Sequence, residues 1–389
     1  MKRGITAVFS AGFLQGAAFV LIPALGTTLR SAPYDMSNAT YGLLYFPEII
    51  GAVLAAISAG AIHKRLGSTG LFRLGAVTNA VAMALLVVAF FASGMPIVLL
   101  LLAETFMLGI GFGLTNAAIN RAASLLFAGA AAAAVTILNA VIGGATAISP
   151  LILDGFQYWV SWVLWPAVIL ALWLCLLLLP LAKDHDSKEL GGIRAWRRSM
   201  MPFAMAVVIY AICEGSFGSW ANVLVSVDRH LPAATGALAL SLFWGGMTVA
   251  RFIFGAIPDR WIHRRLTYLL APLGMATCFV VIPHLQTATG LLIAFTVAGI
   301  ACGIYYPYSM SYGIAAHPKE GTQMAGLLVG ALMVGEGIGS SGLGPLQQWI
   351  SLNNIYSFSA LWAIPLLWLA WRNSRHSGPQ RTPFEANHG

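Results

Sequence analysis

The stretch GAIHKR at residues 60–65 returns as GAIPDR at residues 255–260, which is 195 residues further along a chain of 389. Pro150 and Pro345 each close a glycine-rich segment and are also 195 residues apart. Two coincidences at one offset, close to half the chain length, indicate two related halves. We therefore expect an internal duplication with pseudo-twofold symmetry.

The composition places the chain in a membrane. Hydrophobic residues make up 59% of the sequence and charged residues only 9%, whereas a soluble domain carries about 25% charged residues. So few charges cannot cover the surface of a water-soluble protein of this length, so the surface must face lipid. In a membrane protein the formal net charge of +8 is interpreted from how the basic residues divide between the two sides of the membrane. We therefore expect no nucleic-acid partner.

Twelve apolar segments are long enough to cross a bilayer. They lie near residues 5–26, 40–62, 69–92, 95–119, 130–153, 158–181, 201–225, 234–257, 266–284, 288–314, 322–349 and 354–371. Backbone groups in lipid have no water to bond, so each segment must be a helix. The predicted fold is an all-α integral membrane protein of two six-helix bundles.

The basic residues predict the orientation and the domain boundaries. Of the 21 Lys and Arg residues, 18 fall on the side of the termini and two on the other side, with Arg251 inside a segment. This bias places both termini in the cytoplasm, and the protein in the cytoplasmic (inner) membrane. The polar stretch KDHDSKELGGIRAWRRS, 183–199, predicts a cytoplasmic linker at mid-chain. We expect bundles at 1–182 and 200–372 and a disordered tail at 373–389.

The loop after the second segment resembles that of the major facilitator superfamily. The family motif G-x-x-x-D-R-x-G-R/K-R/K is similar to GAIHKRLGSTG and, in the second half, to GAIPDRWIHRR. The second copy has the acid as Asp259, whereas the first has Lys64 at that position. The resemblance implies two bundles rocking around a central site, with cytoplasmic gate residues Arg65, Asp259 and Arg260. Arg251 is either a further gate residue or an anchor whose long stem reaches the cytoplasmic face.

Within that family, three segments resemble the fucose permease group of proton-coupled symporters. They are LFWGGMTVARFIFGAIPDR at 242–260, EGSFGSW at 214–220 and GIGFGLTNAAIN at 109–120. The resemblance implies proton-coupled symport of a small polar solute. Asn116 stands where that group has an acid in its fourth span.

Four acids inside the apolar segments are the candidate proton or cation sites. They are Glu48, Glu104, Glu214 and Glu336, and helical rise places them roughly 12–20 Å below the outer surface. Each charge costs at least about 2.5–3.5 kcal/mol at the bilayer centre, and Arg251 alone cannot pair with all of them. Either some carry protons, since burial favours the neutral carboxyl group, or a cationic substrate provides the missing charge.

Structural roles for the same acids stay open. Glu214 could form a hydrogen bond to a neighbouring helix, and Glu104 could reach interfacial water. Glu48 follows Pro47, which frees a backbone carbonyl. Glu336 lies between two glycines, a pattern typical of close helix contacts.

Polar and aromatic residues at a similar depth are the candidate substrate-binding residues: Asn116, Asn120, Asn139, Trp220, Asn222, Trp244, Tyr305, Tyr308 and Tyr312. The three tyrosines fall at i, i+3 and i+7, so they form one helical stripe. Such a polar-aromatic stripe suits a cationic or amphipathic ligand, although aromatic rows between helices are also common.

The chain lacks enzyme and nucleotide motifs. It contains no Walker-type loop, H-E-x-x-H, C-x-x-C or G-x-S-x-G stretch, so we expect no enzyme activity, cofactor or metal. We predict a monomeric, proton-coupled secondary active transporter of a small polar solute, with protons and membrane lipids as its other partners. The alternatives are a proton-driven efflux antiporter for cationic or amphipathic compounds and a non-transporting receptor or assembly factor on the same fold.

Overall fold

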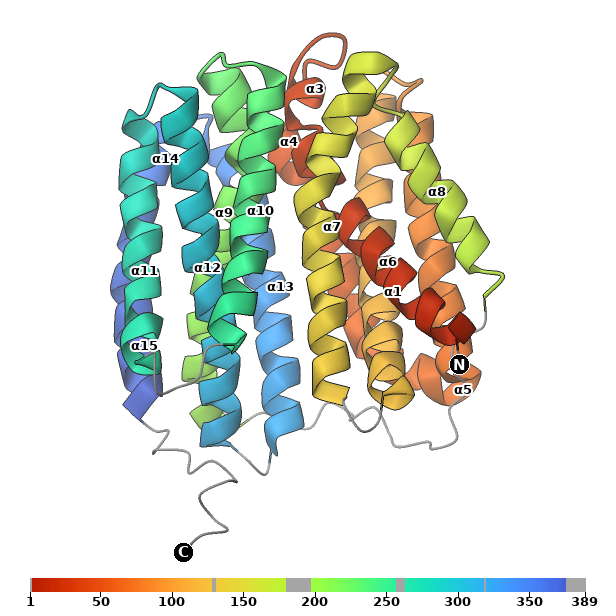
Figure 1. Cartoon of the computed structure of the whole chain (residues 1–389). Coiled ribbons are helices and arrows are strands. Elements are labelled where there is room, and N and C mark those ends of the chain that lie inside the picture. The colour runs from red at the N-terminus through yellow and green to blue at the C-terminus, as the bar shows by residue number, and fades with distance from the viewer. Residues whose placement is uncertain (1, 128–130, 180–196, 257–262, 318–319, 376–389) are drawn as a thin grey trace, which may run out of the picture.

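Helices form all the regular structure in the part of the chain that the computed structural model describes, residues 2–127, 131–179, 197–256, 263–317 and 320–375 (Figure 1). The first half of the chain contains α1 (Lys2–Phe19), α2 (Leu21–Ala24), α3 (Gly26–Arg30), α4 (Asn38–Leu43), α5 (Tyr45–Ala89), α6 (Met95–Leu126), α7 (Ala131–Trp159) and α8 (Leu164–Leu176). The second half contains η2 (Arg198–Met200), α9 (Met201–Val223), η3 (Leu224–Asp228), α10 (Ala233–Ala256), α11 (Arg264–Val281), η4 (Ile282–His284), α12 (Ala288–Ala316), α13 (Gly321–Leu346), α14 (Leu352–Ser359), η6 (Ala360–Trp362) and α15 (Ala363–Arg375).

The two halves of the chain lie side by side, with the first half on the right of Figure 1 and the second on the left. Contacts between them run from α7 to α10, from α4 and α5 to α13, and from α2 and α3 to α9. The start of α1 and the end of α15 lie toward the lower end of the bundle in Figure 1. We call this the terminal end, and the opposite end, which carries the loop at 31–37, the loop end.

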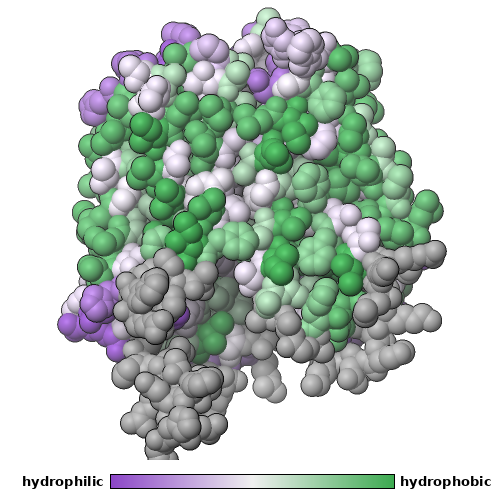
Figure 2. All heavy atoms as spheres, viewed as in Figure 1, coloured by the Kyte–Doolittle hydropathy of each residue, from purple (hydrophilic) through white to green (hydrophobic). Residues whose placement is uncertain are grey.

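The outer surface is apolar along the middle of the helices. Large side chains such as Leu99, Ile293 and Ile364 are at least 60% exposed, and Figure 2 shows hydrophobic residues between polar ones that gather toward the ends. Nine helical segments among the described residues are long and apolar enough to cross a membrane, and Gly4–Phe19 and Leu164–Leu176 are shorter apolar helices. The chain is a multi-pass membrane protein, as its composition predicted.

The first three predicted spans are connected in ways that the sequence did not indicate. The segments expected at 40–62 and 69–92 are two helices that meet at a kink within α5 (Tyr45–Ala89), at the non-helical residue Gly67, where φ is 68° and ψ is −179°. Only glycine adopts this conformation at low cost, so the helix direction changes without a loop. The first segment is instead divided into α1, α2 and α3, with breaks at Val20 and Leu25.

Glycine residues set the close approach of helices in both halves. A Cβ atom at Gly109 on α6 would collide with the Glu48 carbonyl on α5, and one at Gly299 on α12 would collide with the Phe243 carbonyl on α10. Glu48 and Phe243 are again 195 residues apart. Since small residues let helix backbones approach closely in lipid, both halves contain a similar packing contact, although the two glycines are 190 rather than 195 residues apart.

We expect Gly299→Ala to destabilise the second half. Its methyl group must push α12 away from α10, and overpacking of this kind costs roughly 1–3 kcal/mol. Gly326→Ala on α13 is the matched control, because a Cβ atom there has no neighbour within 4 Å. Thermal unfolding of the purified protein should show a lower Tm for Gly299→Ala only. Equal Tm values for the two variants would contradict this role of Gly299.

Some predicted features fall outside the described residues. These are the greater part of the 183–199 linker, the tail beyond residue 375, and the predicted gate residues Asp259 and Arg260. The tail was predicted to begin at residue 373, but α15 continues to Arg375. There the side chain of Asn373 is buried and donates a hydrogen bond to the Pro202 carbonyl at 3.3 Å.

Candidate functional site

A cavity lies between the two halves of the chain. The first half contributes Phe19, Pro23, Tyr45, Glu48, Ile49, Ala52, Gly109 and Phe112 to its lining, and the second contributes Ser219, Trp244, Met333, Glu336, Gly337 and Ser340. The space open to water-sized molecules is about 40 Å³, enough for roughly three or four waters. Since both halves line it, any movement of one half against the other changes its shape.

Two acids face this cavity from opposite halves, and the lining contains no basic residue among the described ones. Glu48 comes from α5 and Glu336 from α13. Glu336 interacts electrostatically with both Glu48 and Glu214, and Glu48 with Glu104. Linked by these pairwise interactions, the four predicted acids form a series, here called the acid row, that includes residues of both halves.

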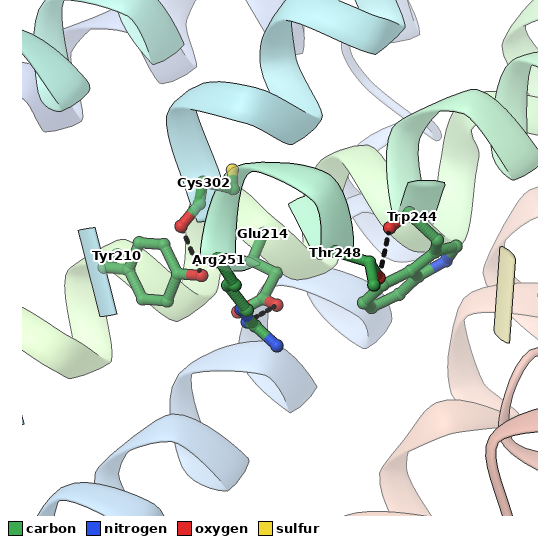
Figure 3. Close-up of polar contacts among 6 residues, drawn as sticks. All are labelled: Tyr210, Glu214, Trp244, Thr248, Arg251 and Cys302. Atoms are coloured by element: carbon green, nitrogen blue, oxygen red, sulfur yellow. Dashed lines mark hydrogen bonds and ion pairs between the residues drawn. The ribbon is translucent and has the colours of Figure 1, made fainter. Parts of the chain in front are cut away.

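Glu214 ends this row in an ion pair with Arg251 (Figure 3). One oxygen, Oε1, lies 3.5 Å from Arg251 Nη2, and the other, Oε2, is buried without a hydrogen-bond partner. The Glu214 side chain is 4% exposed and that of Arg251 39% exposed. Arg251 thus contacts a buried carboxylate while more than a third of its own side chain stays exposed.

Glu104 at the other end of the row is completely buried, and neither carboxylate oxygen has a hydrogen-bond partner. An unpaired ionised carboxylate in such surroundings is very costly. Interfacial water, one of the structural alternatives for Glu104, does not reach it in this state.

Asn222 and Trp220, two predicted substrate residues, seal the loop end instead. Asn222 Oδ1 accepts a hydrogen bond from Thr27 Oγ1 at 2.9 Å, and its Nδ2 donates to the Ala24 carbonyl at 2.6 Å. The Trp220 indole donates to the Ser340 carbonyl at 2.9 Å and packs edge-on against Tyr41, whose hydroxyl donates to the Ser219 carbonyl at 3.1 Å. These contacts join α2, α3 and α4 of the first half to α9 of the second.

The tyrosine stripe packs within the second half. Tyr305 is fully buried between Tyr210, at a ring-centroid distance of 5.2 Å, and Tyr268, at 4.7 Å. Tyr312 and Tyr308 lie 5.2 and 6.4 Å from the same Tyr268 ring. The prediction of a ligand-facing stripe therefore finds no support in this state, because Tyr268 on α11 provides a protein partner for all three rings.

The remaining predicted residues lie toward the terminal end or on its surface. Asn120 donates to Asn116 Oδ1 at 2.6 Å, so the two share one helix face as expected. Asn139 is exposed on α7 and donates to Val135 of its own helix, and Arg65 is exposed on α5. Of the predicted substrate residues, Trp244 alone is among the cavity-lining residues in the described part of the chain.

Sequence reasoning missed several residues at the interface. Tyr45, Phe19 and Phe112 line the cavity, and Ser219 Oγ donates to Ser340 Oγ at 2.7 Å. A hydroxyl at Ser340 within the glycine-rich GEGIGSSGLG was the available signal, since small polar residues bond across helices in membranes. The aromatic residues gave no such signal, because apolar rings are common throughout the sequence.

A helical bundle with a cavity shared by its two halves is typical of secondary transporters. A model of the Major Facilitator Superfamily matches residues 5–345, and the chain belongs to this family. The family predicted from the loop motif is thereby confirmed. No curated protein sequence matches the chain closely enough to be counted as a relative.

Solved transporters have the same fold at low sequence identity. The inward-open xylose transporter XylE of E. coli has a TM-score of 0.72 and 14% identity, with 98% of each chain covered. A bacterial homologue of the human lysosomal transporter Spinster, inward-facing and occupied, has a TM-score of 0.71 and 13% identity, with 96% of each covered. The fucose:proton symporter FucP of E. coli has a TM-score of 0.60 and 18% identity, covering 95% of this chain and 98% of that chain.

Proposed function

We propose that this protein is a proton-coupled transporter that moves a small solute across the cytoplasmic membrane by alternating access. The observation that carries the proposal is the cavity between the halves, with Glu48 and Glu336 facing it from opposite sides. Its volume of about 40 Å³ suits a small solute better than a large amphiphile. The fucose permease likeness of the sequence favours uptake.

The described state is closed at the loop end. Asn222, Tyr41 and Tyr45 join the halves there, while the Arg251 guanidinium, on the other side of the cavity, keeps contact with solvent. We infer that substrate reaches the cavity from the terminal end in this state. Breaking the hydrogen bonds at the loop end would then expose the same cavity to the opposite side.

The Glu214–Arg251 pair is the proposed coupling element. A proton on Glu214 removes the charge that holds Arg251, and its unpartnered Oε2 leaves one lone pair available for that proton. Released Arg251 can then move between its inward position and solvent. The role of Arg251 as a gate is therefore our proposal, with Arg65, Asp259 and Arg260 retained as the gate residues that the loop motif implies.

The same proposal includes the architecture expected from the sequence: twelve spans in two bundles, a monomer surrounded by lipid, and both termini in the cytoplasm. Repeated glycine contacts at Gly109 and Gly299 support the two-bundle division. The described basic residues of α15, Arg372 and Arg375, lie at the terminal end, which the basic-residue bias assigns to the cytoplasm.

Proton-driven efflux of a cationic compound is the second candidate. The observation that favours it is the imbalance of charge, since four acids form the row and Arg251 pairs with Glu214 alone. The sign of coupling separates the two candidates, because in symport the solute follows the protons and in antiport it moves against them.

Flux in proteoliposomes tests the function. The purified full chain is reconstituted, a pH gradient is imposed with the membrane potential clamped, and uptake of labelled L-fucose, D-xylose, uridine and ethanolamine is followed with an internal pH indicator. We expect one of these solutes to move with a matching change in internal pH, absent from protein-free vesicles. Binding of a solute without any flux would instead support the receptor alternative.

A further inference from the structure

We propose that the cavity binds a small primary ammonium compound that also carries a neutral hydrogen-bond acceptor, such as an amino alcohol. This inference rests on the proposed function and names the substrate class of its site. Three observations carry it: an unsatisfied donor on Trp244, two acids without a basic partner, and aromatic walls around a small volume.

Trp244 presents a donor without an acceptor. Its side chain lines the cavity and is 9% exposed, yet its indole Nε1 has no hydrogen-bond partner. Figure 3 shows this nitrogen pointing away from Arg251. An indole nitrogen only donates, and buried tryptophans normally find an acceptor. In this state the nitrogen itself is buried, so the ligand oxygen that completes its hydrogen bonding, a hydroxyl or a carbonyl, meets it when the ring turns toward the cavity.

The two cavity acids require a cationic hydrogen-bond donor, whereas Trp244 requires an acceptor. Among the described residues, neither Glu48 nor Glu336 has a salt bridge within 4.0 Å. Glu336 interacts electrostatically with the acids Glu214 and Glu48 and is opposed only by Arg251. A bound ammonium group would donate to carboxylates from both halves and would relieve their mutual repulsion.

The walls favour an organic cation over a metal ion. Phe19 packs between Phe112, tilted at a ring-centroid distance of 5.4 Å, and Trp244, edge-on at 5.9 Å, and aromatic faces attract ammonium groups. The described residues contain no group of three or more His, Cys, Asp or Glu side chains that could hold a metal ion. Hard cations such as Ca²⁺ take about 6–8 oxygen ligands, which two acids and the serine hydroxyls of this lining do not supply.

In this state the cavity has room for a ligand of a few non-hydrogen atoms. Room for roughly three or four waters matches ethanolamine, which has an ammonium group and a hydroxyl two carbons apart. Two probes of the same length separate the contributions. Propylamine keeps the charge and replaces the hydroxyl with a methyl group, and ethylene glycol keeps a hydroxyl and replaces the charged group with a second hydroxyl.

Competition against labelled ethanolamine on the purified full chain ranks the three compounds by their binding affinity. Ethylene glycol should bind roughly ten- to a hundredfold more weakly, because it loses a charged hydrogen bond, and propylamine about three- to tenfold more weakly, because it loses a neutral one. For a ligand of this size even the best affinity lies at tens of micromolar, so titrations must extend to millimolar concentrations.

Two variants locate the two contacts. Trp244→Phe should remove the preference for ethanolamine over propylamine. Trp173→Phe is the control and should keep this preference. Trp173 also has a buried, unpartnered indole, but it lies on α8 outside the cavity lining. Glu336→Gln should weaken both amines about tenfold or more, and Glu320→Gln, an acid at the terminal end paired with Arg197, should weaken neither. Thermal unfolding of each variant establishes that it is folded.

Each outcome bears on one of the two proposals. Equal binding of ethanolamine and ethylene glycol, or an unchanged amine preference in Trp244→Phe, overturns the ligand class. Proton-coupled flux of another solute without amine binding also overturns it and leaves transport standing. Specific ethanolamine binding without flux supports the ligand class and contradicts transport.

Discussion

Replacement of Glu214 with Gln is expected to abolish solute accumulation driven by a pH gradient. A gradient of one pH unit corresponds to about 1.4 kcal/mol per proton, so one coupled proton sustains about a tenfold concentration ratio. Glutamine has nearly the same shape but cannot bind and release a proton. Accumulation by the variant should therefore stop at equal concentrations inside and outside, while exchange of labelled for unlabelled solute at equal pH continues.

The arrangement around Glu214 is the reason for this expectation. Its Oε1 faces Arg251 at 3.5 Å, and its Oε2 has no partner although the side chain is 4% exposed. When such a carboxylate takes up a proton it loses its negative charge, and its ion pair with Arg251 is lost at the same time. The measurement is the steady-state ratio in proteoliposomes with the membrane potential clamped, over a series of imposed gradients.

Glu320→Gln is the control, since it removes the same charge from the exposed Arg197–Glu320 pair and should keep the wild-type ratio. If Glu214→Gln accumulates solute like the wild type, another member of the acid row carries the proton and the proposed coupling is wrong. Loss of both accumulation and exchange would indicate a binding or folding role instead.

The internal repeat could be predicted from the sequence because its two copies contain identical residues. GAIHKR and GAIPDR share an offset of 195 with Pro150 and Pro345, and the offset also relates Glu48 to Phe243 in the packed structure. The contacts themselves could not be predicted, since helical glycines look alike in sequence. Gly299 collides with a carbonyl when a methyl group is added, whereas Gly326 meets nothing within 4 Å.

The four acids could also be identified from the sequence, because a charged residue within an apolar segment is rare. Their partners could not. Arg251 was expected near the cytoplasmic end of its span, yet its long side chain reaches Glu214, which is 37 residues away in sequence. Charge and depth can be counted along one helix, whereas the direction of a flexible side chain depends on the neighbouring helices.

Polar residues with two plausible partners were the least predictable. The row Tyr305, Tyr308 and Tyr312 has the spacing of a ligand-facing stripe, but Tyr268 on another helix occupies that face. Asn222 has the depth of a substrate residue and instead binds α2 and α3. A periodic pattern identifies a helix face but does not tell whether a protein or a ligand covers it.

Arg251→Gln is expected to lower the free energy of unfolding by roughly 2–3 kcal/mol. Removing one partner from a fully buried pair costs about 3–5 kcal/mol because a charge stays buried alone. The value here should be smaller, since the guanidinium is 39% exposed and a lone Glu214 can take up a proton. Denaturant or thermal unfolding in detergent at neutral pH measures the change.

The double variant Arg251→Gln with Glu214→Gln should recover most of that loss, because no charge then remains buried. Arg197→Gln supplies the comparison: its pair with Glu320 is shorter, at 2.9 Å, but the arginine is 68% exposed, so its loss should cost at most about 1 kcal/mol. If the shorter exposed pair proves the costlier to break, distance rather than burial governs these interactions. A double variant as unstable as Arg251→Gln alone would mean that Arg251 stabilises the fold through its packing and not through its charge. In that case protonation of Glu214 would not release Arg251.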